Sequence, residues 1–423
     1  MSRNMLTADQ VAARLGVKLS TVYAYVSRGI LSRTVASDGK SSRFDAAEVD
    51  QLARRGRPRA DARRAGTVDV VLATSLTGIL DDRLIYRGHD ATELARTSTL
   101  EAVAELLWTG VLPEAAAWPT DPSAVRVAKA ADSGLPESSP LTERLAVVTA
   151  ALACANPLRI DLQPHAVQAH AASLMTTLVA VLPKLAGTTT PRPAPAPAAA
   201  DRARGAAAPS GALTLAARMW PRLSALPANP KRVRVLDAAL ILLADHELST
   251  STFAARVAAS TRGDPYAVVL SGLGAVSGRL QGAAGHAPFQ MLQAARAHGS
   301  ADRAVADALA AHGSVPGMGH PLYETVDPRA ACLFELLEPL LGRRDGALVD
   351  AVISSAATTS RARPNIDMAT AALAFAMRMS ADATEAMFDI ARIAGWIAHA
   401  IEEYGEAPLR FRARALYTGP PPA

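Results

Sequence analysis

Cysteine is scarce in this chain of 423 residues. Only Cys154 and Cys332 are present, and they lie far apart in the sequence. Two distant cysteines exclude a disulfide framework and argue against a cysteine-ligated metal site. We therefore expect a reducing, intracellular environment, and we predict no metal site.

Aromatic residues are also few, at 4% of the chain, whereas alanine is abundant throughout. This balance favours packed helices over a β-sandwich, in which aromatic and β-branched residues would dominate. Half of the residues are hydrophobic and a fifth are charged, which excludes disorder of the chain as a whole. The length predicts two or three domains.

Long apolar runs are missing as well. The longest, residues 171–182, is shorter than the about 20 residues that a membrane-spanning helix needs. Residues 1–5 contain no apolar signal core. We therefore expect a cytoplasmic protein that makes no contact with a membrane.

Positive charge is concentrated at the front of the chain. Residues 1–65 hold 13 Lys+Arg and 6 Asp+Glu, a net charge of +7, whereas the whole chain has +5. The remainder is therefore slightly acidic. A localised basic excess indicates an anionic partner, such as nucleic acid, for this segment alone.

Two short helices joined by a tight turn are predicted in this basic segment. Thr7 and Gln10 have the spacing of a capping box, and Gly16 ends the first helix. Ser20 is predicted to cap a second helix over residues 21–28. Together these elements form a helix-turn-helix.

A wing follows over residues 31–44, and a closing helix is predicted over 46–55. The run LTADQVAARLGVKLSTVYAYVSRGIL followed by SRF resembles the mercury-resistance-regulator and excisionase type of winged helix-turn-helix. This resemblance implies a domain over residues 1–55 that places its second helix in the DNA major groove. A small helical protein-interaction module is the alternative. The implied contacts to double-stranded DNA come from Ser20, Thr21, Tyr23, Arg28 and Arg43.

The rest of the chain has a different character after a basic linker, residues 56–66. Short strand-like pieces with a turn at Asp81 and Asp82 precede amphipathic helices that start near Ala91 and Thr99. Helices rich in Ala and Leu then continue to the end. A Pro/Ala-rich stretch over 188–211 cannot form a core and is predicted to be a surface insertion.

Six motifs are spread along this body. They are YRGHD at 86–90, ADHE and STST within 244–252, VPGMGH and DPR within 315–329, PNID at 364–367, ARIAGWIAH at 391–399 and RARALYTG at 412–419. In this order they resemble the citrate synthase and methylcitrate synthase family over about residues 67–419. The insertion and the stretch before it match poorly.

The resemblance implies a mainly α fold, a two-domain helical body preceded by the small winged helix-turn-helix. The large domain would comprise residues 67–282 and 376–423, and the small domain residues 283–375, with the active cleft between them. The family also implies an obligate homodimer, which would present two helix-turn-helix units to a symmetric operator.

The implied activity is the condensation of acetyl-CoA or propionyl-CoA with oxaloacetate, a transferase reaction of the tricarboxylic acid cycle. No cofactor is implied beyond acetyl-CoA as co-substrate. The chemistry needs a base for a methyl proton, a donor for the enolate, and cations for a dicarboxylate. The sequence does not choose between the two thioesters.

The resemblance assigns these tasks to particular residues. Asp367 matches the catalytic base, although an aspartate at a helix start is also a routine cap. His320 matches the histidine that holds and polarises the ketone. Arginine suits carboxylate binding because its planar fork donates two hydrogen bonds. The implied substrate contacts are His246, Arg329, Arg392 and, from the neighbouring subunit, Arg412; the implied CoA contacts are Val315, Pro316, Gly317 and Gly319.

One position departs from the family pattern. Gln281 stands where the family has a catalytic histidine that donates to the enol of acetyl-CoA. A glutamine amide can donate but cannot shuttle a proton. His286 lies five residues later and would face elsewhere on a helix. The alternatives are therefore a weakened enzyme and a DNA-binding regulator whose body senses oxaloacetate, citrate or acyl-CoA; nothing calls for a pure protein scaffold.

Overall fold

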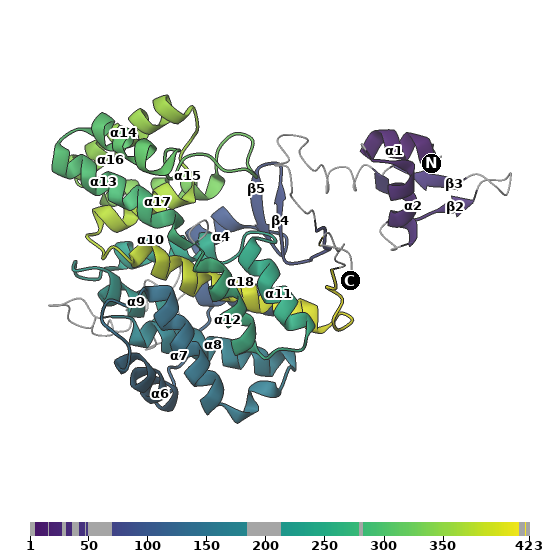
Figure 1. Cartoon of the computed structure of the whole chain (residues 1–423), viewed down its shortest axis with the longest axis horizontal. Coiled ribbons are helices and arrows are strands. Elements are labelled where there is room, and N and C mark those ends of the chain that lie inside the picture. Colours follow the sequence, from purple (N-terminus) through teal and green to yellow (C-terminus); the bar gives the residue numbers. More distant parts are fainter. Residues whose placement is uncertain are drawn as a thin grey trace, which may run out of the picture. The chain divides into compact units, whose positions relative to one another are not determined.

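The computed structural model in Figure 1 describes residues 5–15, 17–27, 31–35, 42–46, 48–49, 70–183, 213–278, 282–413 and 419. The chain forms two compact units, residues 1–73 and 74–423. The basic linker, the Pro/Ala-rich insertion, Arg28 and Gln281 lie outside the described residues. Helices dominate the second unit, as the mainly α prediction requires.

The first unit combines two helices with a three-stranded antiparallel sheet of order β1-β3-β2. The predicted capping box is present: the Thr7 amide donates to Gln10 Oε1 at 2.8 Å, and the Gln10 amide donates to Thr7 Oγ1 at 3.2 Å. Its elements are β1 (Met5–Thr7), α1 (Ala8–Leu15), α2 (Leu19–Ser27), β2 (Thr34–Val35) and β3 (Ser42–Asp45).

The start of α2 differs from the prediction. The helix begins at Leu19, before the expected cap Ser20. The carbonyl of Lys18 accepts from the Thr21 amide at 2.8 Å, so Lys18 stands at the cap position. The predicted closing helix is described only at residues 46 and 48–49, which are helical.

A small core supports this unit. Val11 of α1 and Val22 of α2 are completely buried, as their i, i+4 patterns indicate. Leu31 and Phe44 close the core from the sheet side. The wing is therefore packed onto the helix pair by β3, which also pairs with β1, a strand that the sequence reasoning did not predict.

The second unit opens with a small antiparallel sheet. Strands β4 (Thr77–Leu80) and β5 (Arg83–Tyr86) form a hairpin, and β6 (His89–Asp90) pairs with β5. The predicted turn at Asp81 and Asp82 is confirmed, with φ values of 51° and 58°. Two successive left-handed residues are typical of the tight turns that suit the twist of a hairpin.

The helices follow with starts near those expected. Asp90 caps α4 and Thr99 caps α5, each through its side chain. Their bounds are α4 (Ala91–Thr97), α5 (Leu100–Thr109), α6 (Pro122–Ser133), α7 (Leu141–Ala155), η1 (Pro157–Ile160), α8 (Pro164–Val181), α9 (Leu215–Leu223), α10 (Pro230–Leu243), α11 (Thr250–Ser260), α12 (Pro265–Val276), η2 (Gly282–Gly285), α13 (His286–His298), α14 (Ala301–His312), α15 (Pro328–Leu337), η3 (Glu338–Leu340), α16 (Arg343–Ser360), α17 (Ile366–Ala376) and α18 (Ala383–Tyr404).

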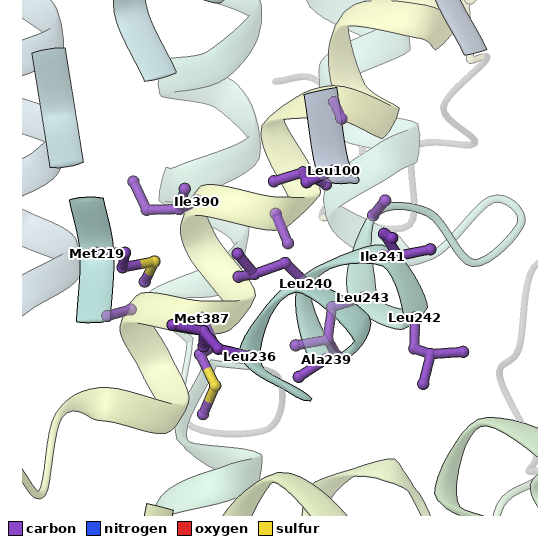
Figure 2. Close-up of a cluster of buried hydrophobic side chains, with 14 of the residues drawn as sticks. Leu100, Met219, Leu236, Ala239, Leu240, Ile241, Leu242, Leu243, Met387 and Ile390 are labelled. Carbon is purple, nitrogen blue, oxygen red and sulfur yellow. The ribbon is translucent and has the colours of Figure 1, made fainter. Parts of the chain in front are cut away.

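Helix α18 runs through the middle of the second unit, with α5, α8, α10, α11 and α12 packed around it. Figure 2 shows how Leu236 and Leu240 of α10 meet Met387 and Ile390 of α18. The helices approach closely: a Cβ on Gly272 of α12 would lie 2.5 Å from the Trp396 ring. This packing fixes the end of α10, which precedes His246, and the middle of α18, which carries Arg392.

Helices α13 to α17 gather at one end of the same unit (Figure 1). They cover residues 286–376, close to the predicted small domain, whose separation from the large domain stays a prediction. No helix that the structure describes is long and apolar enough to cross a membrane.

Candidate active site

Two histidines and a tyrosine from separate segments form the centre of the site. His246 follows α10, whereas His320 and Tyr323 lie in the loop before α15. The two imidazole rings are 4.9 Å apart between centroids, and His246 Nε2 lies 2.8 Å from the Tyr323 hydroxyl. His246 is buried, with 6% of its surface exposed.

Both histidines are held neutral. Burial, then the charge of Arg329, lowers the pKa of His320 to about 4. Burial, followed by the charges of nearby groups led by Arg329, lowers the pKa of His246 well below its ordinary value. The Leu322 amide donates to His320 Nδ1 at 3.2 Å, so the proton of the neutral ring is on Nε2. His320 Nε2–H is therefore a fixed hydrogen-bond donor.

Arg329 is buried beside these rings and forms a bidentate pair with Asp327. Arg329 Nε lies 3.0 Å from Asp327 Oδ1, and its Nη2 lies 2.8 Å from Oδ2. Burial favours the neutral acid, but the charge and hydrogen bonds of Arg329 outweigh it and lower the pKa of Asp327. Asp327 Oδ2 also accepts from the Ile366 amide at 3.0 Å. The pair thus joins the first turns of α15 and α17.

Arg392 of α18 is buried, as its place between isoleucines predicts. Its Nε donates to the Leu243 carbonyl at 2.8 Å, and its Nη1 donates to Ser249 Oγ at 3.3 Å. A buried arginine needs an anionic partner, yet among the described residues no carboxylate lies within ion-pair distance of Arg392. Burial lowers its pKa, with the charge of Asp245 acting against that.

Asp367 stands in the first turn of α17. The cap of this helix is Asn365, whose side-chain oxygen accepts from the amides of Asp367 at 3.0 Å and Met368 at 3.3 Å. Asp367 is therefore not the routine cap that its position allowed. The residue is partly exposed, but the protein around its carboxyl group raises the pKa to about 6, with Arg329 acting to lower it.

The loop with the predicted CoA contacts is attached to the start of α17. Asn365 Nδ2 donates to the Gly319 carbonyl at 2.8 Å, and its amide donates to the Gly317 carbonyl at 3.0 Å. Gly317 has a φ of 75°, and a Cβ there would lie 2.9 Å from Pro288. Only glycine fits this turn. Val315 is buried and Pro316 lies beside it, and the CoA contacts themselves stay a prediction.

Among the described residues, the predicted site residue Arg412 is not part of this cluster. Arg412 is exposed and makes no contact with the histidines or with Arg329 among the described residues. Gln281 lies outside the described residues. His286 begins α13, and its Nε2 lies 2.8 Å from Gln290 Nε2. Because Gln281 is not described, the prediction that His286 faces away from it stays untested.

Sequence reasoning gave no role to several residues that build the site. Asp327 stands inside a quoted motif, Tyr323 lies between two quoted motifs, and Asn365 precedes the predicted base. Ser249 follows the ADHE motif and contacts Arg392. Each of these residues holds another group of the site in place by a hydrogen bond. Such contacts join residues distant in the sequence, so only the folded structure shows them.

The predicted DNA contacts are only partly described. Tyr23 on α2 is 43% exposed, and Thr21 is half-buried beside it. Arg43 on β3 is half-buried in the wing. The side chain of Ser20 and all of Arg28 lie outside the description. Tyr23 is therefore the clearest candidate for a contact.

Comparison with known proteins agrees with both units. The family model for the citrate synthase C-terminal domain matches residues 66–414, and a helix-turn-helix domain model matches residues 5–57. The chain is 31% identical over 375 residues to a citrate synthase of Haloferax volcanii, covering 84% of this chain and 96% of that protein. It is 28% identical to 2-methylcitrate synthase 2 of Corynebacterium glutamicum, covering 79% and 88%.

Among solved structures, citrate synthase from Thermotoga maritima aligns with a TM-score of 0.62 at 25% identity, covering 84% of this chain and 95% of that one. The family model and these relatives cover most of the chain, and they define its class as a synthase of the acyltransferase type. The chain belongs to the citrate synthase family.

Proposed function

We propose that the chain condenses acetyl-CoA or propionyl-CoA with oxaloacetate, in the manner of a citrate synthase. The observation that carries the proposal is the meeting of Asp367, two neutral histidines and two buried arginines from four separate segments. With acetyl-CoA and water, the products are citrate, CoA and a proton.

Asp367 is the base. Its raised pKa of about 6 leaves it ionised at neutral pH yet basic enough to take a proton from the methyl group of the thioester. The electron pair of that C–H bond becomes the enolate, whose carbon then bonds to the ketone carbon of oxaloacetate. Positioned acid–base groups of this kind contribute about 10²–10⁴-fold in rate.

His320 supports the second half of the step. Its Nε2–H is aimed by the Leu322 bond to Nδ1, and it polarises the ketone oxygen on which charge develops. A neutral donor suffices for this task. The neighbouring His246, whose Nε2 is hydrogen-bonded to the Tyr323 hydroxyl, provides a second polar side chain near the ketone.

Arg329 and Arg392 supply the positive charge that holds the two carboxylates. Each is fully buried, and Arg392 is bonded only to neutral oxygens among the described residues. A buried guanidinium without a carboxylate partner has a strong preference for an anionic ligand. The third arginine of the family pattern, Arg412, would come from a second copy in a homodimer.

The test is the release of CoA thiol from acetyl-CoA and oxaloacetate by three chains: wild type, Asp367→Ala and Gln281→His. Removing one enolate donor typically costs about 10²–10³ in rate. We expect wild type to exceed Asp367→Ala, and Gln281→His to exceed wild type by about tenfold or more. Propionyl-CoA, run in parallel, distinguishes the two thioesters.

Equal turnover of wild type and Asp367→Ala would contradict catalysis by the natural chain. If Gln281→His nevertheless gained activity, the rest of the site would be able to support the condensation, and the natural chain would have lost this reaction. In that case the body would act as a binding module for the same ligands.

DNA binding is the second candidate, and the observation that favours it is the capped helix pair joined to a wing in the basic front segment. The proposed regulator would bind duplex DNA through α2, and its body would sense oxaloacetate, citrate or acyl-CoA. Ligand binding would act by shifting the population of two states of the body.

This candidate is tested with the full-length chain and DNA from its own gene neighbourhood. Affinity should fall steeply with salt, because Lys and Arg contacts release counterions. Tyr23→Ala should weaken specific binding, whereas the same change at Tyr25, which packs on the core of the unit, should unfold it instead. Absence of any shift at low salt, with or without the metabolites, would overturn this role.

A further inference from the structure

The chain beyond α18 is held against α11. We define residues 405–413 as the C-terminal arm. The Leu409 amide donates to the Ser260 carbonyl at 2.8 Å, and the Phe411 ring lies 5.5 Å from the ring of Phe253. Leu409 has a φ of 57°, a conformation that a leucine adopts only when its surroundings impose it. The arm is therefore built to follow one path.

A bidentate ion pair fixes this path. Arg410 Nε donates to Glu403 Oε1 at 2.7 Å, and Arg410 Nη2 donates to Glu403 Oε2 at 2.6 Å. The Glu403 side chain is fully buried, whereas that of Arg410 is 27% exposed. Two parallel charge-assisted bonds set the direction of the arm as well as its position.

The same carboxylate belongs to a buried network that reaches the active site. Arg256, fully buried on α11, donates to Glu403 Oε2 at 3.0 Å and to His399 Nδ1 at 3.0 Å. His399 Nε2 then lies 3.1 Å from Asp245 Oδ2, and Asp245 is the residue before His246. The arm is thus anchored on the framework that carries a site histidine.

Arg412, two residues beyond this pair, is exposed in its own protomer. Among the residues that the structure describes, no carboxylate pairs with it. An arginine on such a firmly anchored segment, with its charge left outward, fits an anion that another molecule presents. We propose that Arg410 is a positioning residue, which holds the arm so that Arg412 reaches the dicarboxylate bound by a second copy of this chain.

This inference rests on the proposed function and adds the device that delivers the third arginine. Without the ion pair, the arm would have to become ordered when the ligand binds, and the entropy cost would lower the affinity for oxaloacetate. Arg410→Gln should therefore raise the KM for oxaloacetate about tenfold, as the loss of one charge-assisted contact does, and leave kcat within about twofold. Arg410→Lys should recover part of the loss, because its point charge keeps the ion pair without the fork.

Arg159→Gln is the matched control. Arg159 also pairs with a carboxylate, that of Asp264 at 2.8 Å, and its side chain is 36% exposed. We expect its KM to equal that of wild type. In an Arg412→Gln background, Arg410→Gln should add nothing, since the group that it positions is gone.

Mixed dimers of differently tagged chains test the delivery to the second copy. One chain carries Asp367→Asn together with Arg410→Gln, and its partner is wild type, so only the wild-type site turns over. Its KM should be raised, because its third arginine comes from the altered arm. When the two substitutions are divided between the chains, the active site receives an intact arm and its KM should be normal.

The two ideas fail in different ways. If wild type shows neither turnover nor calorimetric binding of oxaloacetate, the proposed function fails and this inference falls with it. If wild type binds oxaloacetate but Arg410→Gln has an unchanged KM and dissociation constant, or if the raised KM appears in the dimer with divided substitutions, Arg410 does not position Arg412 and the inference alone is overturned.

Discussion

Burial acts on the site in opposite directions at Asp367 and His320. It disfavours the charged form of both, so it raises the pKa of the acid to about 6 and lowers that of the imidazole to about 4. At neutral pH the Asp367 carboxyl is therefore ionised, whereas the His320 ring is neutral. Arg329 restrains the first shift, because its positive charge favours the carboxylate.

The pH dependence of the rate tests these two opposite pKa shifts. Asp367 must be ionised to accept a proton, so kcat/KM for the condensation should fall below a limb at about pH 6. His320, with a pKa of about 4, should add no limb between pH 5 and 8. Initial rates of CoA release over this range are the measurement. A flat profile through pH 6 would assign the base to another group.

Among the elements, α17 carries the greatest share of the site. Its cap Asn365 serves two structures at once: the side-chain oxygen holds the first amides of α17, and the side-chain nitrogen holds the Gly319 carbonyl. Asp327 bonds the Ile366 amide from the other side. The start of one helix thereby sets the place of Asp367, the proposed base, of the loop with His320 and of the Asp327–Arg329 pair.

Asn365→Ala should expose this double role. Loss of the cap should lower the free energy of unfolding by about 1–2 kcal/mol, as caps do. Because the loop at Gly319 is also released, the KM for acetyl-CoA should rise severalfold.

Asn229→Ala is the matched control for this change. Asn229 caps α10 by accepting from the Arg232 amide at 2.9 Å, and this end of α10 is away from the loop. We expect a similar loss of stability, measured by denaturant unfolding, with an unchanged KM. An equal change in KM for both variants would show that general loosening, not the loop, is responsible.

At the scale of the whole molecule, buried acids make stability depend on pH. Thr142 Oγ1 lies 2.6 Å from Asp389 Oδ2 and also within hydrogen-bond distance of Glu385 Oε1. A hydroxyl has one hydrogen, so one of these acids must itself donate a proton. Burial raises the pKa of Asp389 to about 8, which identifies it as the neutral acid.

The sign of the effect follows from that raised pKa. The contribution of neutral Asp389 is complete below its ordinary pKa of 3.8 and is lost as the pH rises toward about 8. Each pH unit in this window costs up to about 1.4 kcal/mol for one such group. Asp389→Asn, which cannot ionise, should gain stability relative to wild type between pH 5 and 8. Unfolding by denaturant at both pH values measures the difference, and a difference independent of pH would show that Asp389 is ionised in the fold.

Asp237 provides an independent comparison. It is buried on α10, its Oδ1 accepts from the Leu100 amide at 2.8 Å, and burial followed by the charge of Glu101 raises its pKa to about 8. Asn at this position keeps an oxygen for the Leu100 amide. The free energy of unfolding of Asp237→Asn, relative to wild type, should also increase between pH 5 and 8. This result would show that buried acids in general cause the pH dependence.

Much of the protein could be predicted because the relevant signals are local. Capping at Thr7, the helix start near Thr99, the turn at Asp81 and Asp82 and the buried positions Val11 and Val22 depend on residues a few positions apart. The order of motifs indicated the family, whereas the roles that the resemblance assigns to the site residues stay predictions. The start of α2 was placed wrongly, because the helix begins at Leu19 and the Lys18 carbonyl accepts its first hydrogen bonds, two residues before the expected cap Ser20.

The sequence by itself determined the mainly helical composition, the basic front segment, the departure at Gln281 and the residue types of the site. Only the tertiary structure decided how those residues act. Asp367, the proposed base, has a raised pKa because burial disfavours its charged form, and it is not a cap because Asn365 caps α17. The proposed positioning role of Arg410 depends on its ion pair with the buried Glu403. Such effects arise from desolvation and from charges distant in sequence, which no local pattern records.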